Sequence, residues 1–185
     1  ASMLALLRRR IPGGDGVSLH ALPARIGIRQ SRQACCRHRL TEQEVLHGVR
    51  FPDAIANGSY RVDVHYPDRD GLVFRYLDGR EVIAHGDGSH TSGRWRESGD
   101  DVATFYQIPY RSLVPEAATN LLVAGRCLDA DRGAFGAVRV MVNASQTGHA
   151  AGVAAHLAAS RDCAVGEVDV AELRDLLTQQ GAVIL

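Results

Sequence analysis

The sequence predicts a mixed α/β fold (α+β), and three observations lead to this expectation. Residues 60–66, YRVDVHY, alternate apolar and polar side chains as a half-buried strand does. Residues 72–85 contain two apolar runs joined by Asp78-Gly79, the turn chemistry of a β-hairpin. Residues 148–160 carry Ala and Gly at helical spacing. Strands in the middle of the chain are therefore combined with a helix towards its carboxy end.

The composition suits one domain, or a large piece of one. The chain has 185 residues, of which 45% are hydrophobic, enough for a real core. Its 21 basic residues, all arginine, balance 21 acidic residues, so no basic excess indicates binding to nucleic acid. No apolar run approaches the length of a membrane span. The four cysteines form no C-x-x-C pair and predict reduced thiols in a cytoplasmic protein.

Further helices are expected at both ends of the chain and after Thr41. Residues 3–10 are typical of the last turns of a helix that Pro12 ends, and this abrupt apolar start suggests a preceding segment. Capping-box sequences begin at Thr41 and Asp169, and each predicts a helix directly after it.

The remaining segments are predicted to be short or irregular. Residues 53–57 indicate a short turn or helix closed by Gly58. Residues 85–101 are polar and rich in glycine, which favours a loop. Residues 104–114 predict a strand at an edge or a bend, because Pro109 lies inside it.

The most informative stretch covers residues 120–160. Residues 121–124 form an apolar run that Gly125 closes, which predicts a buried strand. We expect a loop of about 15 residues next, and then a helix that begins near Gly148. Small residues share one face of that helix: Gly148, Ala151, Gly152 and Ala155. This face predicts either close packing against a strand or a helix N-terminus aimed at a polar, partly anionic cofactor.

Arginines lie near these elements in the sequence. Arg126 follows the glycine that closes the expected strand, and Arg139 precedes the expected helix. Arg25, Arg29 and Arg32 share a short extended segment. Guanidinium groups bind phosphates and carboxylates through paired hydrogen bonds, so the group predicts an anion site. Each arginine alone is explained as well by a place on the surface.

Three blocks of the sequence resemble the carboxy-terminal part of the bacterial FAD-dependent oxidoreductase family, within the glutathione-reductase-like FAD superfamily. The first block is ARIGIRQSR at residues 24–32, followed by Leu40-Thr-Glu and Asp53-Ala-Ile-Ala. The second is IPYRSLVP at residues 108–115. The third is NLLVAGRC at residues 120–127, followed by Arg139-Val-Met and by GHAAG at residues 148–152. The resemblance spans roughly residues 4–183.

The resemblance implies a partial FAD/NAD(P)-binding-like fold. Residues 1–23 and 116–185 would form part of the FAD-binding domain, and residues 24–115 a β-rich, substrate-side region. The amino-terminal dinucleotide-binding half would be absent, because the sequence contains no G-x-G-x-x-G fingerprint. The expected partners are therefore a small-molecule substrate and a complementary amino-terminal FAD-binding chain or segment.

The resemblance also implies an FAD site and a hydride transfer between a small organic substrate and flavin N5. The expected cofactor-binding residues are Ala124, Gly125, Arg126, Arg139, Gly148, His149, Ala150 and Ala151. The free N–H groups of the helix beginning near Gly148 would stabilise the pyrimidine edge of the reduced flavin. The catalytic residues are unknown, with Arg29, Arg139 and His149 as candidates. No metal site is expected.

Departures from the family pattern affect mainly the substrate side. His149 stands where the family usually has Gln, Gln30 where it often has Glu, and Val142 where Pro is common.

Two other functions remain open. Without the Gly-rich half, the chain would be a non-catalytic truncated remnant or a small binding module that cannot hold FAD alone. A thiol- or metal-based enzyme would use Cys127 with Asp129 or Asp131.

Overall fold

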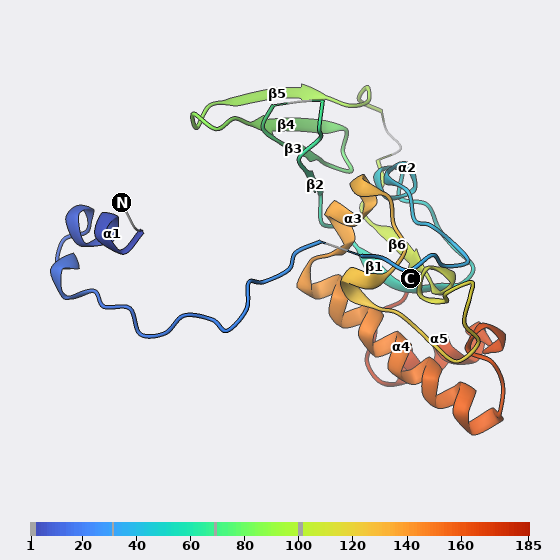
Figure 1. Ribbon diagram of the computed structural model, residues 1–185. Coiled ribbons are helices and arrows are strands. Elements are labelled where there is room, and N and C mark those ends of the chain that lie inside the picture. The colour runs from blue at the N-terminus through green and yellow to red at the C-terminus, as the bar shows by residue number, and fades with distance from the viewer. Residues whose placement is uncertain (1–2, 31, 69, 100–101) are drawn as a thin grey trace. The chain divides into compact units, whose positions relative to one another are not determined.

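The computed structural model describes residues 3–30, 32–68, 70–99 and 102–185. The chain divides into two compact units, the first ending at Ser31 and the second beginning at Arg32 (Figure 1). In the first unit, α1 (Met3–Arg10) is followed by a short 3-10 turn, η1 (Gly14–Gly16). The helix predicted over residues 3–10 is therefore confirmed.

The second unit contains two antiparallel sheets. In the smaller sheet, β1 (Ala54–Gly58) pairs with β6 (Tyr106–Pro109). The larger sheet has the order β2-β3-β4-β5, formed by β2 (Val62–Val64), β3 (Leu72–Arg75), β4 (Arg80–Ala84) and β5 (His90–Arg94). These sheets and the helices around them confirm the mixed α/β class, and β3 and β4 confirm the hairpin.

Two strands contradict the sequence-based predictions. Residues 53–57 were expected to turn, but β1 occupies most of this segment and is almost entirely buried. Residues 85–101 were expected to be a loop, but β5 pairs along the whole of β4. β5 has the sequence HTSGR and is exposed throughout, so it lacks the apolar alternation that reveals a half-buried strand. Pairing with a neighbour, rather than burial, holds such an edge strand.

Helices form the rest of the second unit. α2 (Glu42–Leu46) precedes the sheets, and α3 (Arg132–Val138), α4 (Met141–Arg161) and α5 (Val170–Gln179) follow them. Figure 1 shows α5 lying beside the long α4. Three 3-10 turns connect these elements: η2 (Tyr110–Leu113), η3 (Gly125–Cys127) and η4 (Val165–Glu167). Among the described residues, no helix combines the length and the apolar character needed to cross a membrane.

The region around residues 120–160 differs from the prediction in three ways. Residues 121–124 belong to no strand, although the Val123 N–H donates to the Leu113 carbonyl. The predicted loop contains α3, whose N-cap is Asp131. α4 begins at Met141 rather than near Gly148, because Val140 is extended and the helical conformation starts directly after it. Val140 is not a residue type that signals a helix start, so the sequence pattern misplaced it.

The core of the second unit lies where the smaller sheet meets the helices. Tyr106 and Ile108 of β6, Ile55 of β1 and Phe135 of α3 are almost completely inaccessible to solvent. α4 packs on β1, and α3 packs on β2. The beginning of α4 is therefore held next to the ends of both sheets.

Candidate functional site

The first turn of α4 has no side-chain cap. Its N-cap residue, Val140, has φ −70° and ψ 155° and offers no oxygen to the first N–H groups. The first backbone bond of the helix joins the Ala144 N–H to the Val140 carbonyl at 2.9 Å. The preceding N–H groups have no partner within the helix, and the helix dipole is positive at this end. α4 therefore begins with hydrogen-bond donors that a ligand can use.

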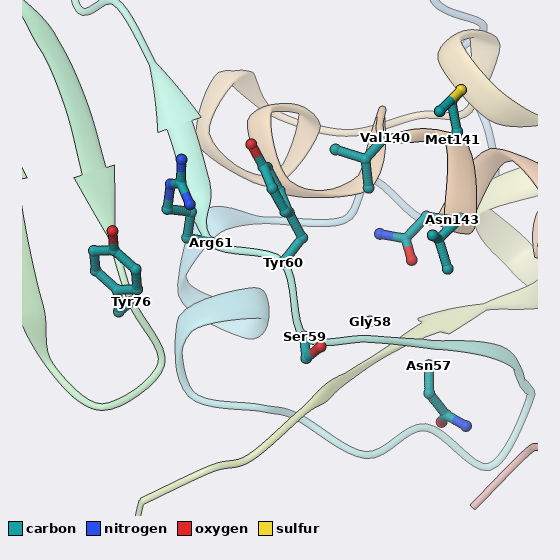
Figure 2. Close-up of a pocket in the computed structure, with 10 residues that line it drawn as sticks. Asn57, Gly58, Ser59, Tyr60, Arg61, Tyr76, Val140, Met141 and Asn143 are labelled. Carbon is teal, nitrogen blue, oxygen red and sulfur yellow. The ribbon is translucent and has the colours of Figure 1, made fainter.

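A pocket of about 550 Å³ lies at this helix start (Figure 2). This volume is within the range of small-molecule sites. We call it the α4-start pocket; its lining residues are Asn57, Gly58, Ser59, Tyr60, Arg61, Tyr76, Val140, Met141, Val142 and Asn143. The connection from β1 to β2 supplies one side of the pocket, and the start of α4 supplies the other. All these residues belong to the second unit.

A buried hydrogen-bond network fixes the helix start. The Asn143 amide donates to the Tyr106 hydroxyl at 2.9 Å and to the Ala137 carbonyl at 3.2 Å. The Tyr106 hydroxyl donates to the same Ala137 carbonyl at 3.2 Å. Burial raises the pKa of Tyr106 well above its usual value, so its hydroxyl stays protonated. The corner between α3 and α4 is therefore anchored from below by β6.

The other side of the pocket is tied to the same helix. The Gln146 side chain accepts a hydrogen bond from the Asn57 N–H and donates one to the Asn57 carbonyl, at 3.1 and 3.0 Å. A Cβ atom at Gly58 would lie 2.4 Å from the Tyr106 ring, so only glycine lets the backbone pass there without a shift. Both sides of the pocket are thus positioned by contacts between main chain and buried side chains.

Arg139 lies just before the helix, as the sequence predicted, but it is engaged with the larger sheet. Its Nη2 lies 3.5 Å from a carboxylate oxygen of Asp63, and the two side chains are 14% and 11% exposed. It also donates to the Asp63 carbonyl at 3.3 Å. This ion pair connects the α3–α4 corner to β2, and it makes Arg139 a positioning group for the corner.

Three further candidates lie at the η3 turn, which packs on α4. Gly125 has φ +60°, the left-handed region that favours glycine, and a Cβ there would lie 3.4 Å from Ala144. Its N–H donates to the Thr147 hydroxyl at 3.0 Å, so this donor is already used within the protein. Ala124 is extended, and its carbonyl accepts from the Cys127 N–H. The side chain of Arg126 is exposed.

The candidates at residues 148–151 lie in the interior of α4 rather than at its start. Ala150 is buried, and Ala151 is partly buried. The His149 Nε2 lies 2.6 Å from the Gln180 side-chain oxygen, next to α5. Gly148 and Gly152 face open space, beside a cavity of about 460 Å³ that also involves Leu176 of α5. These residues therefore do not form the helix tip that was expected to meet the flavin edge.

The arginines of the first sequence block fall into different units. Arg25 and Arg29 are exposed residues of the first unit, and Arg32 begins the second. Arg29 therefore belongs to a different unit from the other catalytic candidates, Arg139 and His149.

The carboxylates next to Cys127 have structural roles. Asp129 accepts from the Cys36 N–H at 2.9 Å, and Asp131 accepts from the N–H groups of Ala134 and Glu42. The four cysteines are free thiols. Within residues 3–30, 32–68, 70–99 and 102–185, no group of three or more His, Cys, Asp and Glu side chains is placed to hold a metal ion.

The sequence analysis missed most of the pocket. It placed Tyr60 and Arg61 in a strand, but β2 begins only at Val62, and both residues lie in the connection from β1 that passes the start of α4. Asn143 lies between apolar residues and carries no pattern of its own. The only local signal for Asn143 is a polar residue four positions after Arg139, and its role becomes clear only from its burial in the structure.

Comparison with known proteins gives one family match. The sequence model of a family described as FAD dependent oxidoreductase matches residues 2–177. No curated protein matches the chain, and no solved structure matches it.

Proposed function

Because the chain belongs to the FAD-dependent oxidoreductase family, whose cofactor is FAD, we propose that the α4-start pocket holds the flavin end of that cofactor. The observation that carries this proposal is the uncapped start of a 21-residue helix at the edge of a small-molecule-sized pocket. The pyrimidine edge of a flavin is electronegative and suits open N–H donors at the positive end of a helix.

The residues present fit the flavin end of the cofactor. The first turn of α4 would donate main-chain hydrogen bonds to the pyrimidine edge, and Asn143 holds that turn in place. Val140 and Tyr60 give the pocket apolar surface for a flat ring. When bound, the flavin supplies the redox chemistry by exchanging a hydride with a small organic substrate at N5. The protein orients the ring and stabilises the charge that collects at its edge.

The pyrophosphate and adenosine parts of FAD would be bound by a further protein segment. The sequence contains no G-x-G-x-x-G loop to cradle phosphates. We therefore place the chain in the carboxy-terminal, substrate-side portion of a glutathione-reductase-like enzyme, completed by an amino-terminal FAD-binding chain or segment. The open face of α4 at Gly148 and Gly152 supports this placement, because backbone can approach closely there. The four free cysteines support a reducing, cytoplasmic setting.

The flavin-end proposal is tested by comparing FAD with riboflavin. If the chain contacts only the flavin end, the two should bind the purified chain with affinities within about threefold, because the adenosine part gains no contacts. Quenching of flavin fluorescence measures both. FAD binding that is tenfold or more tighter than riboflavin binding would show that the chain holds the whole cofactor. Binding of neither, also after addition of a chain carrying the Gly-rich loop, would favour a remnant or binding module that holds no FAD.

Arg126 provides a separate test of the η3 turn. The exposed guanidinium is available for a charge-assisted hydrogen bond, so Arg126→Ala should weaken flavin binding in the completed enzyme by ~1–3 kcal/mol. Arg132→Ala, at an exposed position in the neighbouring helix, is the control. Equal affinities for the two variants would show that Arg126 does not contact the cofactor.

A further inference from the structure

Arg61 is a lining residue of the α4-start pocket, and its guanidinium lies among aromatic rings. The Cζ atom is 4.3 Å from the ring centre of Phe74, 5.2 Å from that of Tyr60 and 5.7 Å from that of Tyr76. Figure 2 shows Arg61 with Tyr60 and Tyr76 beside the pocket. Rings at these distances restrain the side chain and attract its positive charge.

Three arginines near Arg61, two in the larger sheet and one at the end of α3, have carboxylate partners in the structure. Arg75 pairs with Glu42 and Glu81, Arg80 pairs with Asp78, and Arg139 pairs with Asp63. Within the described part of the chain, Arg61 has no acidic partner, and its buried Nε has no hydrogen-bond acceptor. A partly buried guanidinium without an anion is costly, because aromatic faces replace only part of its hydration.

We propose that Arg61 binds the carboxylate of a small anionic substrate with an apolar or aromatic body. This inference rests on the proposed function, because it places the substrate in the same pocket as the flavin end. The terminal nitrogens of Arg61 offer the paired donors that fit a carboxylate. The rings of Tyr60 and Tyr76 and the side chain of Val140 provide apolar walls for the body of the molecule. A carboxylate suits these walls better than a phosphate, which loses more hydration on entering them.

The test uses benzoate as the probe and benzamide as its uncharged counterpart. In NMR titrations of the full chain, benzoate should shift the backbone signals of Ser59, Tyr60 and Arg61. Benzamide should bind at least about tenfold more weakly, because it lacks the charge that a guanidinium recognises. Equal binding of the two compounds, or shifts confined to other parts of the chain, would overturn the proposal. Inorganic phosphate that binds more tightly than benzoate would overturn the choice of a carboxylate.

Variants test whether benzoate binding depends on the Arg61 side chain. Arg61→Met keeps an unbranched side chain without the guanidinium and should reduce benzoate affinity by about tenfold or more, whereas Arg61→Lys should retain part of it. Arg80→Met is the matched control, because Arg80 also lies over the Tyr76 ring, at 4.6 Å, but pairs with Asp78 and does not line the pocket. Dispersed NMR spectra establish that each variant is folded. Equal losses in Arg61→Met and Arg80→Met would contradict the assignment.

Riboflavin binding by the same variants separates this inference from the proposed function. Riboflavin that binds wild type and Arg61→Met equally, while benzoate binds only wild type, supports both. Benzoate binding that depends on Arg61 in a chain that binds no flavin leaves the anion site and removes the flavin pocket. Riboflavin binding in a chain that binds no benzoate leaves the flavin pocket and removes the anion site.

Discussion

The helix starts of the second unit differ in how their first N–H groups are satisfied. α2 begins with a complete capping box, in which Thr41 and Glu44 serve each other's N–H groups. α3 and α5 are capped by Asp131 and Asp169. α4, the longest of these helices, begins at Val140 without a side-chain cap. The protein therefore closes three helix starts with its own oxygens and leaves the fourth open at a pocket.

Because α4 has no side-chain cap, its first turn is held by buried side chains that pack against it and not by a residue at its N-terminus. Asn143, Tyr106 and the Ala137 carbonyl fix the first turn of α4 through a buried network. A side-chain cap would occupy the same N–H groups that a ligand needs. The site keeps its donors free and its geometry fixed at the same time.

The largest expected effect comes from removing the anchor under α4. Asn143→Leu removes two buried hydrogen bonds, from the side-chain amide to Tyr106 and to Ala137, and should lower the free energy of unfolding by about 2–4 kcal/mol. Denaturant unfolding measures this. Ser145→Leu, at an exposed position of the same helix, should change stability little and serves as the control. Similar losses in both variants would show that the network does not hold the helix start.

Alkaline pH should weaken the contact between Tyr110 and the turn that leads to α5. The Tyr110 hydroxyl donates to the Val165 carbonyl at 2.7 Å, in the turn that leads to α5, and burial raises its pKa from 10.0 to about 12. Because the unfolded chain releases this proton at lower pH, the contribution of Tyr110 is complete below pH 10 and is lost between pH 10 and about 12. The loss amounts to about 2–3 kcal/mol.

Unfolding of Tyr110→Phe across this pH range is the measurement. The variant should show a shallower fall in stability with pH than wild type does. Tyr106→Phe should also flatten the curve, because burial raises the pKa of Tyr106 as well. A Tyr110→Phe curve parallel to that of wild type would refute the role of this hydroxyl.

Removing the N-cap of α5 should lower stability and leave riboflavin binding intact. Asp169 accepts from the N–H groups of Ala171 and Glu172 at 2.9 and 3.4 Å. Asp169→Ala should cost about 1 kcal/mol of stability, the usual value of an N-cap. Riboflavin affinity should remain that of wild type, since α5 does not line the α4-start pocket. A parallel loss of binding would mean that the two helix starts are coupled.

Adding a cap where none exists should give the smallest change in stability and the clearest change in binding. Val140→Asp should stabilise α4 by ~0.5–1 kcal/mol, because the new carboxylate accepts the open N–H groups. The same carboxylate should weaken riboflavin binding by about tenfold. Val140→Ala, which adds no acceptor, is the control. Unchanged binding in Val140→Asp would show that the flavin edge does not use these donors.

The sequence predicted elements with strong local signals and missed those that depend on long-range contacts. The capping residues Thr41 and Asp169 located α2 and α5, and Asp78-Gly79 located the β3–β4 hairpin. α3 escaped notice because the RGAFGAV segment contains two glycines, although Asp131 was an available start signal.

The site was predicted only in part. Of the residues expected at the site, Arg139 lies two positions before α4, and Gly125 contacts α4 through its N–H bond to Thr147. The start of α4 was misplaced by seven residues, because the glycine-rich face of the helix interior resembled a tip. Arg61 gave no signal, since an arginine in an alternating strand is normally on the surface. The structure is needed to show that the nearby carboxylates pair with Arg75 and Arg80 and that Arg61 is left without one among the described residues.

The exposed position of Met141 at the first turn of α4 provides a chemical footprint of the pocket. The chain has two methionines, and both side chains are accessible, Met141 at 88% and Met3 at 71%. Dilute peroxide converts accessible thioethers to sulfoxides, which mass spectrometry counts at each position. An occupant of the pocket should shield Met141, while Met3, in the first unit, provides the unshielded reference. The protein thus carries a built-in reporter of occupancy that needs neither turnover nor a coloured ligand.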